Sequence, residues 1–266
     1  MIRGKIARLP YGIKALVLFE AINLTIATVA RNLPYERIGL ANLAMITTMV
    51  IGVVNIFASH KFMCNNNLLE SDDTHPLDRR TWIIIAILSL ILWLFGGRAG
   101  DYLAEVFSDQ NTIHYQRIFG EASSVLVLLS VIFVGPVSEE FVFRGMFFTS
   151  VRHDLGARQA AIITAVFFVL VHHTLMHVFF TFGLGLMLAY IMQKTNNIVD
   201  CIMLHIGFNF SSAILSLLVS ATVVDTKFFQ VIKNPWICVS VSLAAFIYIY
   251  IKFIKDLPGK TKGLSN

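Results

Sequence analysis

The chain has 266 residues, of which 56% are hydrophobic and 14% are charged, whereas a soluble domain carries about 25% charged residues. This composition excludes a water-soluble globular protein. The formal net charge of +5 is compatible with nucleic-acid binding, but the lysines and arginines lie in short segments between and beyond apolar stretches. Such clustering is typical of the loops of a membrane protein, so we expect no nucleic-acid partner.

Several apolar stretches approach the length needed to cross a hydrocarbon core about 30 Å thick. The predicted spans are 12–30, 39–59, 82–97, 122–149, 159–176, 178–192, 198–222 and 234–252. The sequence therefore predicts an all-α integral membrane protein of about eight transmembrane helices. The fifth and sixth spans are joined so tightly, around His177, that they must form a helical hairpin or one broken helix.

The first span is the weakest, because Lys14 and Glu20 make it amphipathic, and it could instead lie along the membrane interface. Glu20 and the lack of a convincing small-residue cleavage site argue against a signal peptide and predict a retained helix. The loops 60–81, with Asp72 and Asp73, and 98–121 are expected to be polar connectors without a readable motif.

Positive charges in the short loops predict the orientation. If the amino terminus is inside, the cytoplasmic segments carry Arg3, Lys5, Arg8, Lys61, Arg79, Arg80, Arg152, Arg158, Lys194, Lys252, Lys255, Lys260 and Lys262. The outer loops then carry the smaller set, Arg31, Arg37, Arg98, Arg117, Lys227 and Lys233. Both termini are therefore expected in the cytoplasm.

The segment GPVSEEFVFRG places two carboxylates and an arginine in an otherwise apolar span. Such groups cost several kcal/mol there unless they pair or face water. Glu140 and Arg144 have the i, i+4 spacing of a helical salt bridge, whereas Glu139 is rotated by about 100° from Glu140. Glu139 is therefore the candidate general base, and Glu140 with Arg144 is expected to be structural. In the alternative interpretation, both glutamates share Arg144 in a structural cluster.

Histidines occur in two later spans. The stretch VFFVLVHHTLMH sets His172 and His173 deep in the fifth span, and His205 and Asn209 share one face of the seventh. A rise of about 1.5 Å per residue places Glu139 and His172 on the order of 20 Å from the basic loops and His205 at roughly 16 Å. We expect these groups to meet in one buried polar cavity.

Together these residues resemble the three motifs of the CAAX-protease and bacteriocin-processing family of intramembrane glutamate proteases, which includes type II CAAX prenyl endopeptidase. The motifs are Glu139-Glu140-x-x-x-Arg144, Phe168-x-x-x-His172 and His205-x-x-x-Asn209. The resemblance covers about residues 120–220. It divides the chain into amino-terminal helices without a recognisable motif (1–120), a catalytic core (121–222), and a last helix with a basic tail (223–266).

The resemblance implies that Glu139 with His172 activates a water molecule, and that His205 and Asn209 hold the oxyanion. It implies a structural role for the carboxylate and guanidinium of Glu140 and Arg144. Phe168 is expected to pack in the core one helical turn before His172.

The expected activity is that of a metal-independent membrane endopeptidase that hydrolyses a peptide or a membrane-associated protein. The family implies roles in peptide or bacteriocin processing, self-immunity or signalling, and the expected location is the bacterial cell membrane with lipid as its surroundings. One alternative is a non-catalytic immunity or regulatory protein that binds a peptide or a sensor kinase. Another is a transporter that uses buried glutamate and histidine as a proton relay.

No cofactor is expected, although a zinc site is an alternative. His172, His173 and His177 with the nearby glutamates could supply ligands, but the chain has no HExxH motif and these histidines diverge around a helix. His173 and His177 are instead expected to be interfacial or hydrogen-bonding residues. The three cysteines, Cys64, Cys201 and Cys238, lack CxxC spacing and are expected to be ordinary apolar residues.

Overall fold

The computed structural model describes residues 10–30, 32–33, 38–68, 76–221 and 234–259, with the backbone alone for 215–221. These residues form helices and contain no sheet, so the all-α class is confirmed for them. Six helices are long and apolar enough to cross a membrane: Tyr11–Ala30, Leu40–Asn65, Arg79–Val106, Ser124–Leu155, Leu175–Thr195 and Pro235–Ile254. Ala157–Leu170 and Ile198–Ile214 are shorter apolar helices. The described chain thus indicates an integral membrane protein.

Some residues named in the sequence analysis lie outside the described residues. They are Arg3, Lys5, Arg8, Arg31, Arg37, Asp72, Asp73, Lys227, Lys233, Lys260 and Lys262, together with the expected boundary between residues 222 and 223.

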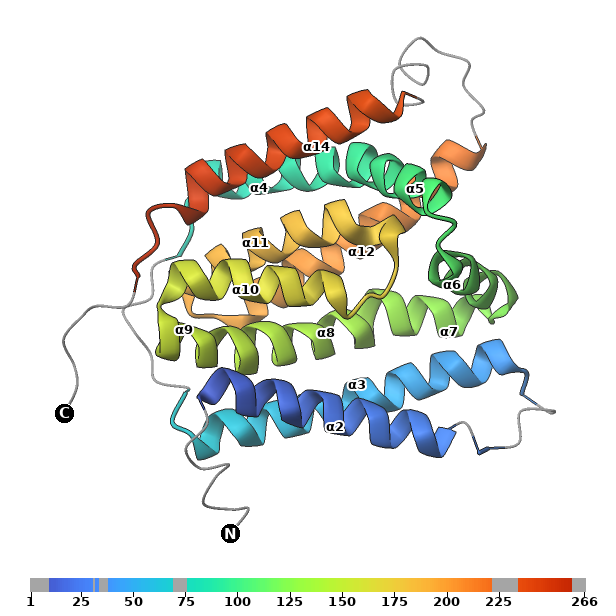
Figure 1. The fold of residues 1–266 in the computed structure, drawn as a ribbon, viewed down its shortest axis with the longest axis horizontal. Helices are drawn as coiled ribbons and strands as arrows, with labels where there is room; N and C mark the ends of the chain where they lie inside the picture. The colour runs from blue at the N-terminus through green and yellow to red at the C-terminus, as the bar shows by residue number, and fades with distance from the viewer. Residues whose placement is uncertain (1–9, 31, 34–37, 69–75, 222–233, 260–266) are drawn as a thin grey trace.

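The first two helices, α2 (Tyr11–Ala30) and α3 (Leu40–Asn65), pack side by side on one flank of the molecule (Figure 1). Within this pair, the Asn55 side-chain amide donates a hydrogen bond of 3.1 Å to Asn23 Oδ1. On the opposite flank lie α4 (Arg79–Ile91) and α14 (Pro235–Ile249). The segments η1 (Leu92–Gly96) and α5 (Gly97–Val106) continue α4, and η5 (Tyr250–Ile254) continues α14.

Residues 98–121 do not form the polar connector that the sequence predicts. Helix α5 continues to Val106, and a separate helix, α6 (Gln110–Glu121), follows. The carboxylate of Asp109 caps α6, because it accepts hydrogen bonds from the Asn111 N–H at 3.2 Å and the Thr112 hydroxyl at 2.6 Å. The predicted loop 60–81 is also shorter, since α3 reaches Asn65 and α4 begins at Arg79.

A continuous helix of five segments runs through the middle of the molecule (Figure 1). The segments are α7 (Ser124–Leu128), η2 (Leu129–Val134), α8 (Gly135–Glu140), η3 (Phe141–Phe148) and α9 (Thr149–Leu155). Both η2 and η3 are π-helical, with wider turns than an α-helix, and they flank the segment that ends in the two glutamates. Such widened turns are frequent at functional sites.

The hairpin expected around His177 is formed by α10 (Ala157–Leu170), η4 (Leu175–His177) and α11 (Val178–Thr195). The fifth span ends earlier than predicted, so the expectation that His172 and His173 lie deep within a helix is wrong. His173 has a φ of 54°, a left-handed conformation that ends a right-handed helix. The His172 side chain is therefore presented from a turn just beyond α10.

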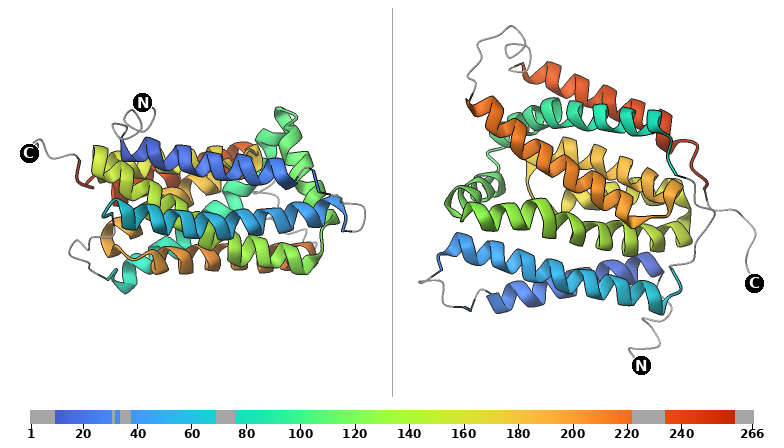
Figure 2. Two further views of the ribbon diagram at one scale, coloured as in Figure 1. Left: turned by 90° about the horizontal axis from the view of Figure 1, so that it is seen from below. Right: turned by 180° about the vertical axis from the view of Figure 1, so that it is seen from behind.

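The next helix, α12 (Ile198–Ala221), packs against both α8 and α11. Figure 2 shows α12 on the far side of the molecule from the view of Figure 1, crossing the neighbouring helices obliquely. The core lies around α11, where Met187, Leu188, Ala189 and Ile191 are fully buried. This arrangement brings α8, the α10–α11 turn and α12 to a common region.

Candidate functional site

The ion pair expected between Glu140 and Arg144 is present and almost completely buried. One guanidinium nitrogen lies 3.1 Å from Glu140 Oε1, and the exposed fractions of the two residues are 0% and 1%. The other terminal nitrogen of Arg144 donates a hydrogen bond of 3.3 Å to the backbone carbonyl of Gly185 on α11. Because a buried charge must be paired, this pair fixes η3 against α11.

His205 joins the two glutamates. Its Nδ1 lies 2.7 Å from Glu140 Oε1, and its Nε2 lies 3.8 Å from Glu139 Oε2. The two carboxylates differ in accessibility, because the Glu139 side chain is 33% exposed whereas that of Glu140 is buried. Glu140 is therefore committed to internal partners, and Glu139 is the carboxylate that a substrate or a water molecule can reach.

The geometry of His172 assigns its protons. Its Nδ1 lies 2.6 Å from the backbone carbonyl of Phe168. A carbonyl oxygen can only accept, so Nδ1 carries the proton and the lone pair of the neutral ring lies on Nε2. Within the described part of the chain, His172 and Glu139 make no direct ion pair with each other. The structure thus leaves Nε2 of His172 available as an acceptor.

Phe168 connects the two histidines. It is fully buried, as expected for a core residue. Its ring makes edge-to-face contacts with His172, at 4.9 Å between ring centroids, and with His205, at 5.8 Å. The Arg144 guanidinium lies 4.7 Å from the centroid of the same ring. Phe168 therefore packs against both His172 and His205, and the Arg144 cation lies over its ring.

Asn209 donates a hydrogen bond of 2.8 Å to the backbone carbonyl of Val131 in η2. This carbonyl is free for a local reason. In the π-helical turn, the Gly135 N–H donates to the Ser130 carbonyl, five residues earlier. With the same i, i+5 spacing, the donor to the Val131 carbonyl would be the N–H of residue 136. That residue is Pro136, which has no N–H. Asn209 therefore satisfies a carbonyl that the helix leaves without a donor, and its second amide N–H is not used in this bond.

Replacing Asn209 with leucine should lower the free energy of unfolding by about 1–3 kcal/mol, because the Val131 carbonyl loses its donor. The second substitution Pro136→Ala supplies a backbone N–H, so it should make N209L less destabilising. Unfolding in detergent micelles of the two single variants and the double variant measures this coupling. Additive effects would contradict the assigned role of Pro136.

Sequence reasoning missed Tyr115, which lies on α6. Its ring packs edge-to-face against His177, at 4.8 Å between ring centroids, and the His177 ring lies 5.9 Å from that of His172. Burial and the nearby Glu139 carboxylate raise the pKa of the Tyr115 phenol, so it is uncharged at neutral pH. No motif or spacing distinguishes this tyrosine in the sequence, because only the packing of α6 brings it to the histidines.

Asp109 attaches α6 to the α10–α11 turn, since its Oδ2 accepts a hydrogen bond of 2.8 Å from the Leu175 N–H. Hydrogen bonds from Thr112 and Leu175 hold the pKa of the Asp109 carboxyl below its usual value of 3.8. A lowered folded-state pKa stabilises the fold above the pKa of the unfolded chain, and this stabilisation disappears as the pH falls through the folded-state value.

We therefore expect Asp109→Asn to lower the unfolding temperature at pH 7, and the difference from wild type to shrink as the pH falls below 3.8. Thermal unfolding in micelles between pH 7 and pH 3 measures this difference. A difference that stays constant over the whole range would show that the Asp109 charge does not stabilise α6.

The donors considered for zinc do not converge. Among the described residues, no three His, Cys, Asp or Glu side chains are grouped to hold a metal ion. The side chain of His173 is exposed, and Nδ1 of His177 is 3.0 Å from the Thr174 hydroxyl. His172 and His177 are in ring contact, but neither they nor the exposed His173 form a group of metal-ligating side chains among the described residues.

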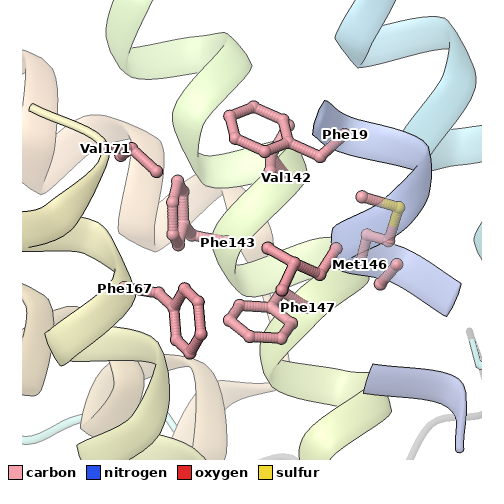
Figure 3. A pocket seen from close by; sticks show the side chains of 9 residues that line it. Phe19, Val142, Phe143, Met146, Phe147, Phe167 and Val171 are labelled. Atoms are coloured by element: carbon pink, nitrogen blue, oxygen red, sulfur yellow. The ribbon is translucent and has the colours of Figure 1, made fainter. Parts of the chain in front are cut away.

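A small apolar pocket opens between α2, η3 and α10 (Figure 3). It is lined by Ala15, Leu16, Phe19, Val142, Phe143, Met146, Phe147, Phe167 and Val171. None of the predicted site residues lines it. The pocket-lining Phe143 also contacts Phe168, at 5.0 Å between ring centroids, and Phe168 is the ring that packs on His172 and His205. This pocket is therefore not the polar cavity that the sequence predicts.

A bundle of apolar helices with a buried cluster of carboxylates, histidine and arginine defines a polytopic membrane protein with an internal polar site. Residues 121–211 match the model of the family described as type II CAAX prenyl endopeptidase Rce1-like, so this part of the chain is similar to that family. The match contains all six predicted site residues and confirms the resemblance. No curated protein and no solved structure matches the chain. The family is one of membrane proteases, which act on proteins or peptides.

Proposed function

We propose that this protein is an intramembrane peptidase that hydrolyses a peptide bond with water activated by Glu139. The observation that carries the proposal is that two adjacent carboxylates have different burial and different partners. Glu140 is buried against Arg144 and His205, whereas Glu139 is accessible and lies beside the other nitrogen of His205. One acid therefore holds the fold, and the other is free for chemistry.

In the proposed reaction, Glu139 takes a proton from water, and the oxygen attacks the carbonyl carbon of the peptide bond. Nε2 of His172 accepts a hydrogen bond from the same water and orients it. The carbon–nitrogen bond then breaks, and the proton held by Glu139 passes to the leaving amine. These reaction steps require no covalent intermediate and no metal.

The negative oxygen of the tetrahedral intermediate needs hydrogen-bond donors. We assign this role to the imidazolium form of His205, whose Nδ1–H donates to Glu140 and whose Nε2–H can then donate to the oxyanion, and to the second amide N–H of Asn209, which lies one helical turn further along α12. Each such donor can be worth about 3–4 kcal/mol in a dry site. The hydrogen bonds of these side chains to Glu140 and Val131 direct both of them toward the helix that carries Glu139, and this common direction supports the assignment.

The proposal also covers the organisation of the chain, its membrane topology and its substrate. Residues 121–222 are the catalytic core, the helices before residue 120 are its scaffold, and all eight apolar segments lie in the bilayer with both termini in the cytoplasm. The substrate is a peptide or a membrane-associated protein, and the cleaved sequence decides whether the cellular role is peptide processing, self-immunity or signalling.

Peptide cleavage by the purified protein in liposomes tests the proposal. Peptides from a membrane fraction are incubated with the protein in ¹⁸O-labelled water, and the products are identified by mass spectrometry. We expect new carboxyl ends that carry the label and are formed equally well with a strong chelator. Proton-coupled uptake without cleavage would favour a transporter. A cellular effect that persists in a Glu139→Ala variant would favour a non-catalytic regulator.

A further inference from the structure

Helix α6 crosses one end of the bundle, next to the turn that carries His172 (Figure 1). At its start, Asp109 accepts the Leu175 N–H at 2.8 Å. About two turns further, the side-chain amide of Gln116 lies 3.6 Å from Met176 Sδ. Between these contacts, Tyr115 packs on His177. The helix thus contacts three consecutive residues of η4.

The same helix is attached to α3 on its other side. Ile118 is buried in a cluster with Ala41 and Met45 of α3. Just beyond the helix, the Ser123 N–H donates a hydrogen bond of 2.7 Å to the Asn42 side chain. Helix α6 therefore spans the distance between α3 and η4.

Helix α5 supports η4 from a further direction. A Cβ atom on Gly100 would collide with the backbone oxygen of Met176, so α5 approaches η4 more closely than any larger residue allows. By contrast, Gly97 on the same helix has no neighbour within 4 Å of such an atom. Gly100 and Gly97 are therefore a matched pair for testing this support.

A row of rings runs from α6 to the site. The Tyr115 ring is perpendicular to that of His177 (87°), which in turn is perpendicular to that of His172 (88°). His177 is held by its contact with the Thr174 hydroxyl. His172 packs against the rings of both Phe168 and His177, and Tyr115 packs against His177. The described residues offer the Tyr115 hydroxyl no hydrogen bond, so the ring itself makes these contacts.

We propose that Tyr115 is a positioning residue, whose ring holds the His172 imidazole toward Glu139 through His177, and that α6 is the strap that keeps this arrangement in place. The proposal rests on the proposed peptidase function for its kinetic consequences, but not for its structural ones. Misplacement of a catalytic group by about 1 Å can reduce the rate on the order of 100-fold.

The kinetic test compares Tyr115→Phe, Tyr115→Ala and a control on the same helix, Ile113→Ala, whose side chain is 55% exposed. The substrate is a peptide that the wild-type protein cleaves in liposomes. We expect Y115A to lower kcat on the order of 100-fold while KM changes less than about threefold. Y115F should retain kcat within about twofold, since it keeps the ring, and I113A should match wild type. Equal losses in Y115F and Y115A would overturn the proposal, as would full activity of Y115A.

A structural test needs no substrate. Hydrogen–deuterium exchange of the 171–177 segment is measured in micelles for wild type, Y115A, D109N, G100A and G97A. We expect faster exchange, including at the Leu175 amide, in the first three variants and wild-type exchange in G97A. Wild-type exchange in both Y115A and D109N would overturn the proposal that α6 holds this segment in place.

The two tests separate the proposals. If wild type and E139Q cleave no peptide, the proposed function fails while the exchange experiment still decides the role of α6. If wild type cleaves and Y115A cleaves equally well, the positioning role fails and the proposed function stands.

Discussion

Replacing Glu139 with glutamine should reduce peptide cleavage by about 10²- to 10⁴-fold, because the amide cannot take a proton from water. The fold should persist, since this side chain is 33% exposed and makes no buried hydrogen bond among the described residues. The measurements are kcat in liposomes and the unfolding temperature in micelles.

Exposed carboxylates give the control for this substitution. Among the residues that the structure describes, Glu121, at the end of α6, pairs with the exposed side chain of Arg117. The variant E121Q should therefore cleave at the wild-type rate. An E139Q variant that folds and cleaves as wild type does would rule out Glu139 as the base.

Replacing Glu140 with glutamine should instead destabilise the protein, by about 3–5 kcal/mol, because it leaves the buried Arg144 without a compensating charge. His205 would also lose its carboxylate partner. The free energy of unfolding in mixed micelles is the measurement, and activity should fall by more than the folded fraction does, because the hydrogen bond that directs His205 is also weakened.

The chain offers a matched control for this effect. Arg117 and Glu121 have the same i, i+4 spacing as the buried pair but are exposed, so E121Q should leave stability nearly unchanged. The double substitution E140L with R144L should be less destabilising than E140Q alone, since no charge remains unpaired. A small effect of E140Q would contradict the structural role of the pair.

Local periodicity was sufficient to predict that Glu140, and not Glu139, pairs with Arg144. The spacing of Glu140 and Arg144 depends only on the helix that carries them, and it survives the π-helical turn in which Arg144 lies. The contact between His205 and Glu140 joins residues 65 positions apart. Periodicity cannot predict such a contact, and the motif resemblance was needed to group these residues.

Other parts of the site depend on backbone details that no pattern revealed. His172 lies beyond α10, where His173 adopts a left-handed conformation. Nothing about a histidine in the sequence predicts this conformation. The bond between Asn209 and Val131 exists because Pro136 follows a widened turn. Tyr115 reaches the histidines only because α6 folds back over the end of the bundle, where the sequence predicted a connector.

The widened turns on either side of Gly135–Glu140 have a consequence for helical phase. An α-helix advances about 100° per residue, whereas a wider turn absorbs an extra residue without the corresponding rotation. The part of the long helix before the glutamates and the part after them are therefore not tied to one helical phase. Each part can keep its own lipid-facing and core-facing sides. A homologous chain with one residue fewer in 129–134 could revert to regular pitch there and still aim its acids at α12. Length variation in this helix should thus be tolerated at η2 and not within 135–140.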